Sequence, residues 1–168
     1  ATVIHGRFGS TASDYAYNNK RTYDVMPCKD GEHATVDNGK IIATTATTYT
    51  RQCICEKCNT VFTKKYNKSA TTLTVKGKTK TVKYKTVKKK NVTVKRKDAI
   101  TVSKNKGTVT YAKSSGNKKI TINKKTGNIT VKKGLKKGTY KVKVKVTAAG
   151  TNTYKKATKT VTVTIKVK

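Results

Sequence analysis

Apolar and polar residues alternate along most of the C-terminal part of the chain, most clearly in Tyr140–Val146, where valines alternate with lysines. Successive side chains of a strand point to opposite faces, so this pattern predicts strands with Val, Ile or Tyr on an inner face and Lys or Thr on an outer face. Strands are predicted in this way at Val82–Tyr84, Val92–Val94, Ile100–Val102, Val109–Tyr111, Ile120–Ile122, Ile129–Val131, Tyr140–Val146 and Val161–Val167. No 3.6-residue periodicity indicates a helix.

Glycines separate these runs, often beside Asn or Lys, which is typical of turns between antiparallel strands. About seven or eight short strands within roughly 100 residues predict an antiparallel β-sandwich of two sheets. Val, Ile, Thr and Tyr suit the inner positions of a pleated sheet, while the lysines stay outside in water. The predicted fold class is therefore mainly β, with this sandwich in the C-terminal part and a small β-rich, Cys/His-stapled module before it.

Composition divides the chain near residues 69–72. Of its 168 residues, 40 are Lys or Arg and 7 are Asp or Glu, so the net charge is +33. Residues 1–70 hold ten of these cations, six carboxylates, all four cysteines and both histidines, whereas residues 71–168 hold thirty cations and one carboxylate, Asp98. This shift predicts two domains, a Cys/His-rich module at 1–70 and a lysine-rich sandwich at 71–168.

The cysteines and one histidine predict a metal or disulfide staple in the first domain. Cys55 and Cys58 form a C-x2-C knuckle that can bring two thiolates to one ion, and Cys28 with His33 would complete a tetrahedral structural zinc site. Cys53 would then be spare, would replace His33, or would take part in a disulfide. The disulfide alternative allows two pairings, Cys28–Cys53 with Cys55–Cys58, or Cys28–Cys55 with Cys53–Cys58. Free thiols are the third alternative.

The segments Ile120–Val131, Gly138–Val144, Ala148–Tyr154 and Thr160–Val167 resemble bacterial immunoglobulin-like and cadherin-like modules at the C-termini of secreted Gram-positive surface proteins. The cysteine and histidine layout resembles the short Cys/His-rich repeats of such proteins. The resemblance implies a β-sandwich that serves as a stalk, spacer or adhesive unit. Calcium-dependent cadherin relatives need several carboxylates at their domain junctions, and with Asp98 alone in this region we expect no calcium.

These features predict a secreted, non-enzymatic protein of a bacterial surface with a structural or adhesive role. The start at Ala1 favours a removed signal peptide, and no apolar run reaches the ~18 residues of a membrane span. A homo-oligomer or homopolymer is expected, with Thr2–Ile4 or Val161–Val167 donated as a strand to a neighbouring subunit.

Anionic cell-wall or mucin polymers are the expected binding partners. Nucleic acid is expected to bind only non-specifically, because aromatic residues for base stacking are scarce among the lysines. The alternative functions are an extracellular module that binds anionic glycan, teichoic acid or nucleic acid, and a fragment of a secreted zinc hydrolase with Glu32 or Glu56 as its base.

Overall fold

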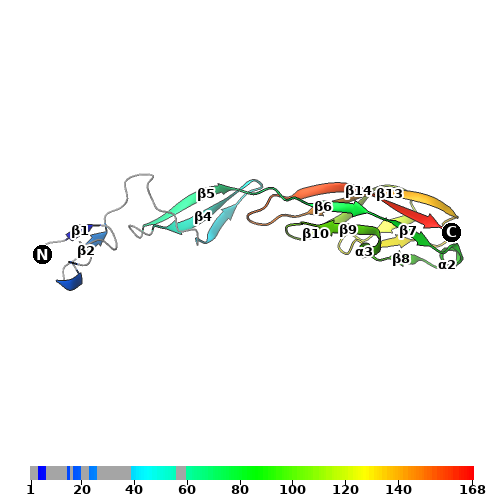
Figure 1. Ribbon diagram of the computed structural model, residues 1–168, viewed down its shortest axis with the longest axis horizontal. Helices are drawn as coiled ribbons and strands as arrows, with labels where there is room; N and C mark the ends of the chain where they lie inside the picture. Colours follow the sequence, from blue (N-terminus) through cyan, green and yellow to red (C-terminus); the bar gives the residue numbers. More distant parts are fainter. Residues whose placement is uncertain (1–3, 7–14, 16, 20–22, 26–38, 56–59) are drawn as a thin grey trace. The chain divides into compact units, whose positions relative to one another are not determined.

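Contacts within the chain fall into two groups, which divide it into unit 1, Ala1–Asn67, and unit 2, Lys68–Lys168. The computed structural model describes residues 4–6, 15, 17–19, 23–25, 39–55 and 60–168 (Figure 1). Unit 2 is therefore described throughout, and unit 1 in part.

Unit 1 is built from short pairings of neighbouring strands. Strand β1 (Ile4–Gly6) runs parallel to β2 (Tyr23–Val25). Strands β3 (Ile41–Thr44), β4 (Thr48–Ile54) and β5 (Val61–Asn67) form a three-stranded antiparallel sheet in chain order. The pairing of β4 with β5 runs from Thr48 opposite Asn67 to Ile54 opposite Val61 without a shift in register.

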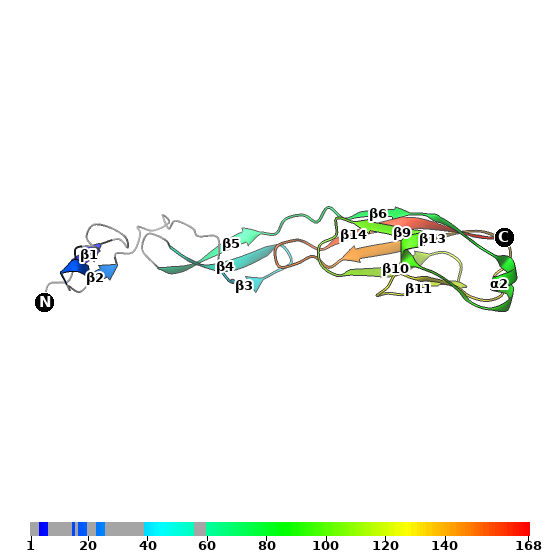
Figure 2. The ribbon, with the colours of Figure 1, turned by 60° about the horizontal axis from the view of Figure 1, so that its bottom comes forward.

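The larger sheet of unit 2 has four strands in the order β10-β13-β14-β7. Strands β13 (Gly138–Ala148) and β14 (Ala157–Val167) are antiparallel over all eleven residues of each and lie side by side in Figures 1 and 2. Strand β10 (Val109–Ser115) flanks β13, and the short β7 (Thr79–Val82) runs parallel to β14. The C-terminal strand is therefore a central strand of its sheet.

The remaining strands form a three-stranded antiparallel sheet and a two-stranded pair. The sheet contains β11 (Ile120–Ile122), β12 (Ile129–Val131) and β8 (Val92–Val94), and the pair contains β6 (Thr74–Gly77) and β9 (Ile100–Ser103). The chain crosses from β6 to β7 at Gly77, where a Cβ atom would lie only 2.0 Å from the Thr162 carbonyl oxygen. A residue without a side chain is required at this close approach.

A continuous apolar core fills unit 2. The inward residues Val142, Val144, Val146 and Ala148 of β13 are fully buried, and the lysines between the valines are exposed, as the alternation predicts. The core is formed by Val82, Val87, Val94, Ala99, Ile100, Tyr111, Ile120, Ile129, Val131, Leu135, Val142, Val144, Val146, Val163, Ile165 and Val167. The predicted mainly β class is confirmed.

Two short helices correct the sequence analysis. Helix α2 (Tyr84–Lys89) and helix α3 (Arg96–Ala99) contain six and four residues, too few for a 3.6-residue period to repeat. The predicted strand Val82–Tyr84 is wrong at its end, because β7 stops at Val82 and Tyr84 begins α2. No helix in the described part of the chain is long and apolar enough to cross a membrane.

Candidate functional site

A row of lysines runs along the outer face of β13. Lys141, Lys143 and Lys145 are exposed and alternate with buried valines. Lys166 lies on the same face but on the neighbouring strand β14, opposite Thr139, the next outward position of β13. Outward positions on one strand recur about every 7 Å. We call Lys141, Lys143, Lys145 and Lys166 the lysine row.

Each lysine of the row has a threonine as its neighbour across the strands. The opposing pairs are Lys141 with Thr164, Lys143 with Thr162, Lys145 with Thr160, and Lys166 with Thr139. Like charges placed directly opposite each other destabilise a sheet, and this register avoids such pairs. The result is a line of three lysines on β13 beside a line of threonine hydroxyl groups on β14, which ends at Lys166.

The outer strands of this sheet extend the hydroxyl-rich surface. The register places Thr79 and Thr81 of β7, and Thr110, Ala112 and Ser115 of β10, on the same outer face. At the outward positions of these four strands, all of which the structure describes, there is no carboxylate and no aromatic ring. The face is therefore cationic and polar, with no internal acid to neutralise its lysines.

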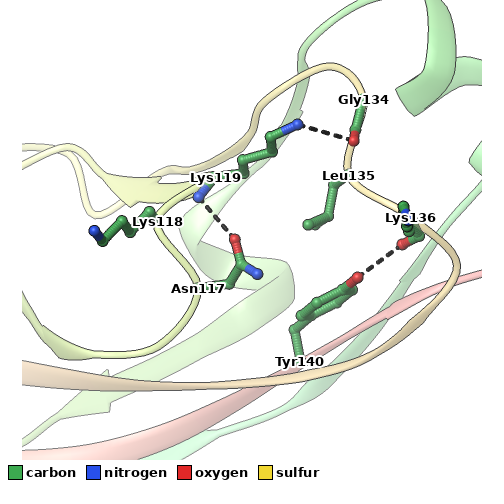
Figure 3. A pocket seen from close by; sticks show the side chains of 7 residues that line it. All are labelled: Asn117, Lys118, Lys119, Gly134, Leu135, Lys136 and Tyr140. Atoms are coloured by element: carbon green, nitrogen blue, oxygen red, sulfur yellow. Dashed lines mark hydrogen bonds between the residues drawn. The ribbon is translucent and has the colours of Figure 1, made fainter.

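A hollow of about 450 Å³ lies near the start of β13, lined by Asn117, Lys118, Lys119, Gly134, Leu135, Lys136 and Tyr140 (Figure 3). The Tyr140 hydroxyl donates to the Lys136 carbonyl oxygen at 2.9 Å, and the Lys119 ammonium donates to the Gly134 carbonyl oxygen at 3.0 Å. A tyrosine that bonds back to the backbone a few residues upstream is a known corner device of β-sandwiches. These contacts hold the entry to β13, so we assign Tyr140 a structural role.

Tyr111 sits at a second hollow, of about 290 Å³, together with Arg96 and Lys125. Burial raises the pKa of the Tyr111 hydroxyl above its ordinary value of 10.0, and the charge of Arg96 offsets part of this rise. The Arg96 side chain donates to the Ile100 carbonyl oxygen at 3.3 Å, and its backbone N–H donates to the Asn128 side-chain oxygen at 3.0 Å. Arg96 thereby fixes α3 against the β11–β12 turn.

The cysteines of the predicted staple are placed only in part. Cys53 and Cys55 are two residues apart along an extended segment and share one face, where they are 0% and 1% exposed. The Cys53 thiol lies 4.0 Å from the Arg51 carbonyl oxygen. Every bond in the two disulfide pairings considered above involves Cys28 or Cys58, so these pairings stay predictions. The predicted ligands Cys28, His33 and Cys58 lie outside the described residues.

One further backbone hydrogen bond joins the two sides of the hairpin that carries these cysteines. The backbone N–H of Cys55 donates to the Thr60 carbonyl oxygen at 3.0 Å. Among the described residues, no three His, Cys, Asp or Glu side chains gather into a metal-binding group. The structure therefore leaves the zinc site a prediction.

An aromatic and cationic cluster on the same hairpin was missed by the sequence analysis. The rings of Tyr49 and Tyr66 face each other across β4 and β5, with centroids 5.3 Å apart. Arg51 lies 5.7 Å from the Tyr49 centroid, and Lys64 lies 5.8 Å from the Tyr66 centroid. Tyr49, Arg51 and Cys53 stand at every second position of β4. This spacing in the sequence could have predicted that the three side chains share one face of the strand.

The edges of the larger sheet bear on assembly by strand donation. Strand β14 pairs with β13 on one side and with β7 on the other, so donating it would break both pairings. At the β10 edge, the Tyr111 backbone N–H donates to the Lys124 carbonyl oxygen at 2.9 Å. The Lys113 ammonium donates to the Asn117 and Ile120 carbonyl oxygens at 3.0 and 2.9 Å.

Of the other predicted donor, Thr2–Ile4, only Ile4 is described, as the first residue of β1.

The cadherin domain model matches residues 67–168, and the chain belongs to this family. Two similar solved structures are crystal structures of Drosophila N-cadherin, EC1-4 and EC1-3, at 14% and 15% sequence identity and TM-scores of 0.40 and 0.35. The alignments cover 74% and 75% of this chain, which spans 34% and 45% of the lengths of those structures. No curated protein matches the sequence.

Unit 2 is thus a cadherin/immunoglobulin-like β module, a non-enzymatic class that supplies extracellular adhesion or structural modules. A calcium ion takes six to eight oxygen ligands, among which carboxylates supply the negative charge. Unit 2 offers one carboxylate, Asp98, whose oxygen lies 3.5 Å from the Lys80 ammonium and whose side chain is 36% exposed. The residues of unit 2 do not fit a calcium ion.

Proposed function

We propose that the chain is a non-enzymatic extracellular protein of a bacterial surface, in which unit 2 serves as a load-bearing stalk and its lysine-rich outer face holds anionic polymers. The observation that carries the stalk role is the parallel pairing of β7 with β14, from Thr79 opposite Thr164 to Val82 opposite Val167. Strand β7 follows directly after β6, the first strand of unit 2, and β14 is the last strand of the unit.

Parallel pairing decides how such a module responds to tension. When the two ends of the chain are pulled apart, β7 and β14 are drawn in opposite directions along their own axes. The hydrogen bonds between them lie across that direction, so all of them are loaded together instead of opening one after another. A module loaded in this way resists tension better than one that opens from an end.

The entry segment is also tied to unit 2. The Ser69 backbone N–H donates to the Thr153 carbonyl oxygen at 2.9 Å, and the Lys155 N–H donates to the Ser69 carbonyl oxygen at 2.8 Å. The Thr71 hydroxyl donates to the Lys155 carbonyl oxygen at 2.6 Å. These bonds lie on the path that carries force from residue 68 to β6, so they support the proposed stalk role.

Single-molecule pulling of the full chain tests the stalk. Pulled between its two ends, unit 2 should unfold in one event that releases about 350 Å of contour length, at about 3.5 Å per residue. The control attaches the N-terminal handle at Lys124, in the β11–β12 turn, so that the β7–β14 pair is not sheared. We expect a clearly lower unfolding force in the control, and equal forces in both geometries would refute the load-bearing role.

We also propose that a structural zinc ion held by Cys28, His33, Cys55 and Cys58 staples unit 1, with Cys53 as a substitute ligand. The burial of Cys55 and its backbone hydrogen bond to Thr60 support this proposal, because they fix one of the four ligands at the end of β4, three positions before Cys58 in the sequence. A bound zinc would contribute folding free energy directly. Loss of a zinc-sized mass with chelator in native mass spectrometry tests the site, and a four-hydrogen deficit would instead indicate two disulfides.

If the chain assembles into a homopolymer by strand addition, we propose the N-terminal segment as donor rather than β14, because β14 is already paired on both sides. Deleting residues 1–5 should then convert an oligomer seen by light scattering at moderate salt into monomers. Full-length protein that stays monomeric at high concentration would exclude assembly and leave the stalk role intact.

A further inference from the structure

We propose that the lysine row and the threonine lane of β14 bind a linear polyol-phosphate chain that lies along β13. The threonine lane consists of Thr160, Thr162 and Thr164. This inference rests on the proposed adhesive function and names the chemistry of its partner.

The row has the geometry of a linear site. Lys141, Lys143 and Lys145 project from one continuous strand whose alternate side chains, Val142, Val144 and Val146, are 1%, 0% and 0% exposed and packed in the core. The backbone beneath the cations is therefore held rigidly, and the charges recur about every 7 Å along it. An extended polymer with regularly spaced charges can contact several of them at once, whereas a compact anion can contact one or two.

The identity of the cations suits phosphate groups. Lysine presents a compact charge with three donors and is a common phosphate ligand, which binds as a point charge without the paired, parallel hydrogen bonds of arginine. All four cations of the row are lysines. Arg96, the single arginine of unit 2, is bonded to the Ile100 carbonyl oxygen and takes no part in this face.

The neighbouring groups favour a polyol backbone over a nucleic acid. Threonine hydroxyls can both donate to and accept from the hydroxyl and ester oxygens of a polyol chain. Binding of single-stranded nucleic acid normally adds aromatic side chains on which the bases stack, and the outward positions of β10, β13, β14 and β7 carry none. The face therefore offers charge and hydroxyl contacts without a platform for bases.

The charges of the row are also available. The one carboxylate of unit 2, Asp98, pairs with Lys80 at the sheet edge, 3.5 Å away. Because the outward positions of the sheet carry no acid, phosphates of a partner would not compete with an internal counterion for the row.

The test uses the full chain and an unacylated poly(glycerol phosphate) polymer as the probe. The row variant carries Lys141→Gln, Lys143→Gln and Lys145→Gln. The control variant carries Lys124→Gln, Lys125→Gln and Lys132→Gln, which removes the same charge from exposed positions outside this face. Thermal unfolding of each variant confirms that the fold is kept.

We expect the row variant to lose at least about tenfold in affinity at moderate salt. The slope of log affinity against log salt should decrease by about three, one for each phosphate that the variant no longer neutralises. The control should stay within about threefold of the wild type. Equal losses in the two variants, or no binding by the wild type, would overturn the proposed site.

A competition experiment separates the polyol-phosphate chain from nucleic acid. The wild type should prefer poly(glycerol phosphate) to an oligo-dT with the same number of phosphates, and Thr160→Val, Thr162→Val and Thr164→Val should reduce that preference without changing the salt slope. Equal binding of oligo-dT would refute the polyol assignment. None of these outcomes depends on the unfolding force, so the stalk role is tested separately.

Discussion

The three-stranded sheet of unit 1 and the sandwich of unit 2 are both made of strands with alternating side chains, yet they bury them very differently. In unit 2, Val144 and Ile165 are 0% exposed because a second layer covers the inner face. In unit 1, Ile54 and Val61 oppose each other across β4 and β5 and remain 50% and 53% exposed. Alternation alone therefore produces a strand, while a buried core requires a second layer.

This difference explains why the two units depend on different stabilising interactions. Among the described residues of unit 1, the buried side chains are those of Cys53 and Cys55. The stacking of Tyr49 on Tyr66 stabilises the fold by about 0.5–1.5 kcal/mol beyond the contribution of the apolar area that the pair buries. A small unit with so little buried aliphatic surface normally relies on a metal or on disulfides.

Removing the staple should produce the largest effect. A zinc chelator is expected to unfold unit 1 completely, so that amide hydrogen exchange in residues 39–55 and 60–67 becomes fast, while exchange in the core strands of unit 2 stays slow. A calcium-specific chelator should change neither unit. The protein used in this test must also lack disulfides. If amides of unit 1 still exchange slowly after zinc removal, the sheet is stable without a staple, and the proposed difference in stabilisation between the two units is wrong.

Core truncation should sharpen the same contrast. Ile165→Ala is expected to lower the free energy of unfolding of unit 2 by about 2–5 kcal/mol, because a fully buried side chain leaves a cavity. Ile54→Ala in unit 1 should change stability by less than about 0.5 kcal/mol, since that side chain is half exposed. Denaturant unfolding, with exchange-resolved mass spectrometry to separate the units, measures both. Similar losses at the two positions would contradict the difference in burial.

A smaller effect is expected at the crossing between the sheets of unit 2. In Gly77→Ala the new methyl group would meet the Thr162 carbonyl oxygen at 2.0 Å. The backbone must shift to relieve this contact, at a cost of about 1–3 kcal/mol. Lys78→Ala, at the exposed neighbouring position, is the control and should stay within about 0.5 kcal/mol in thermal or denaturant unfolding. An unchanged stability in Gly77→Ala would show that β6 can move away from β14 freely.

The smallest predicted effect concerns pH. Burial raises the pKa of Tyr111 above its ordinary value of 10.0. The folded state therefore keeps this proton longer than the unfolded state, and the resulting stabilisation is complete below pH 10 and is lost as the pH rises through the raised pKa. Tyr111→Phe should make the decline of the free energy of unfolding above pH 10 shallower than in the wild type. Parallel pH profiles of the two proteins would argue against a buried, protonated hydroxyl.

Much of unit 2 could be predicted because its strands alternate strictly. The segment Tyr140–Val146 falls within β13, and Val161–Val167 falls within β14, with the apolar residues on the inner side in both. The short helices could not be predicted, because a single turn such as α3 carries no periodic signal and forms where Asn128 and Ile100 accept hydrogen bonds from Arg96. Asn128 is 32 residues away from Arg96 in the sequence. Ile100 belongs to the next element, β9.

The candidate sites differ in the same way. The exposed lysines of β13 follow directly from the alternation, whereas the lane of threonines beside them depends on the pairing register of β13 with β14. A shift of one residue would have placed buried side chains opposite them. The shared face of Cys53 and Cys55 also follows from strand geometry, while the predicted ligands Cys28, His33 and Cys58 come from residue spacing alone.

By itself, the sequence determined the mainly β class, the division in composition near residue 70 and the outward position of the lysines, because each of these depends on neighbouring residues and on the two-residue period of a strand. Only the tertiary structure decided that β14 lies centrally between β13 and β7, that Gly77 lets the chain change sheets, and that the lysines form one file beside a lane of threonines. The physical reason is that strand order and register arise from contacts between segments far apart in the chain, which a local pattern of polar and apolar residues does not encode.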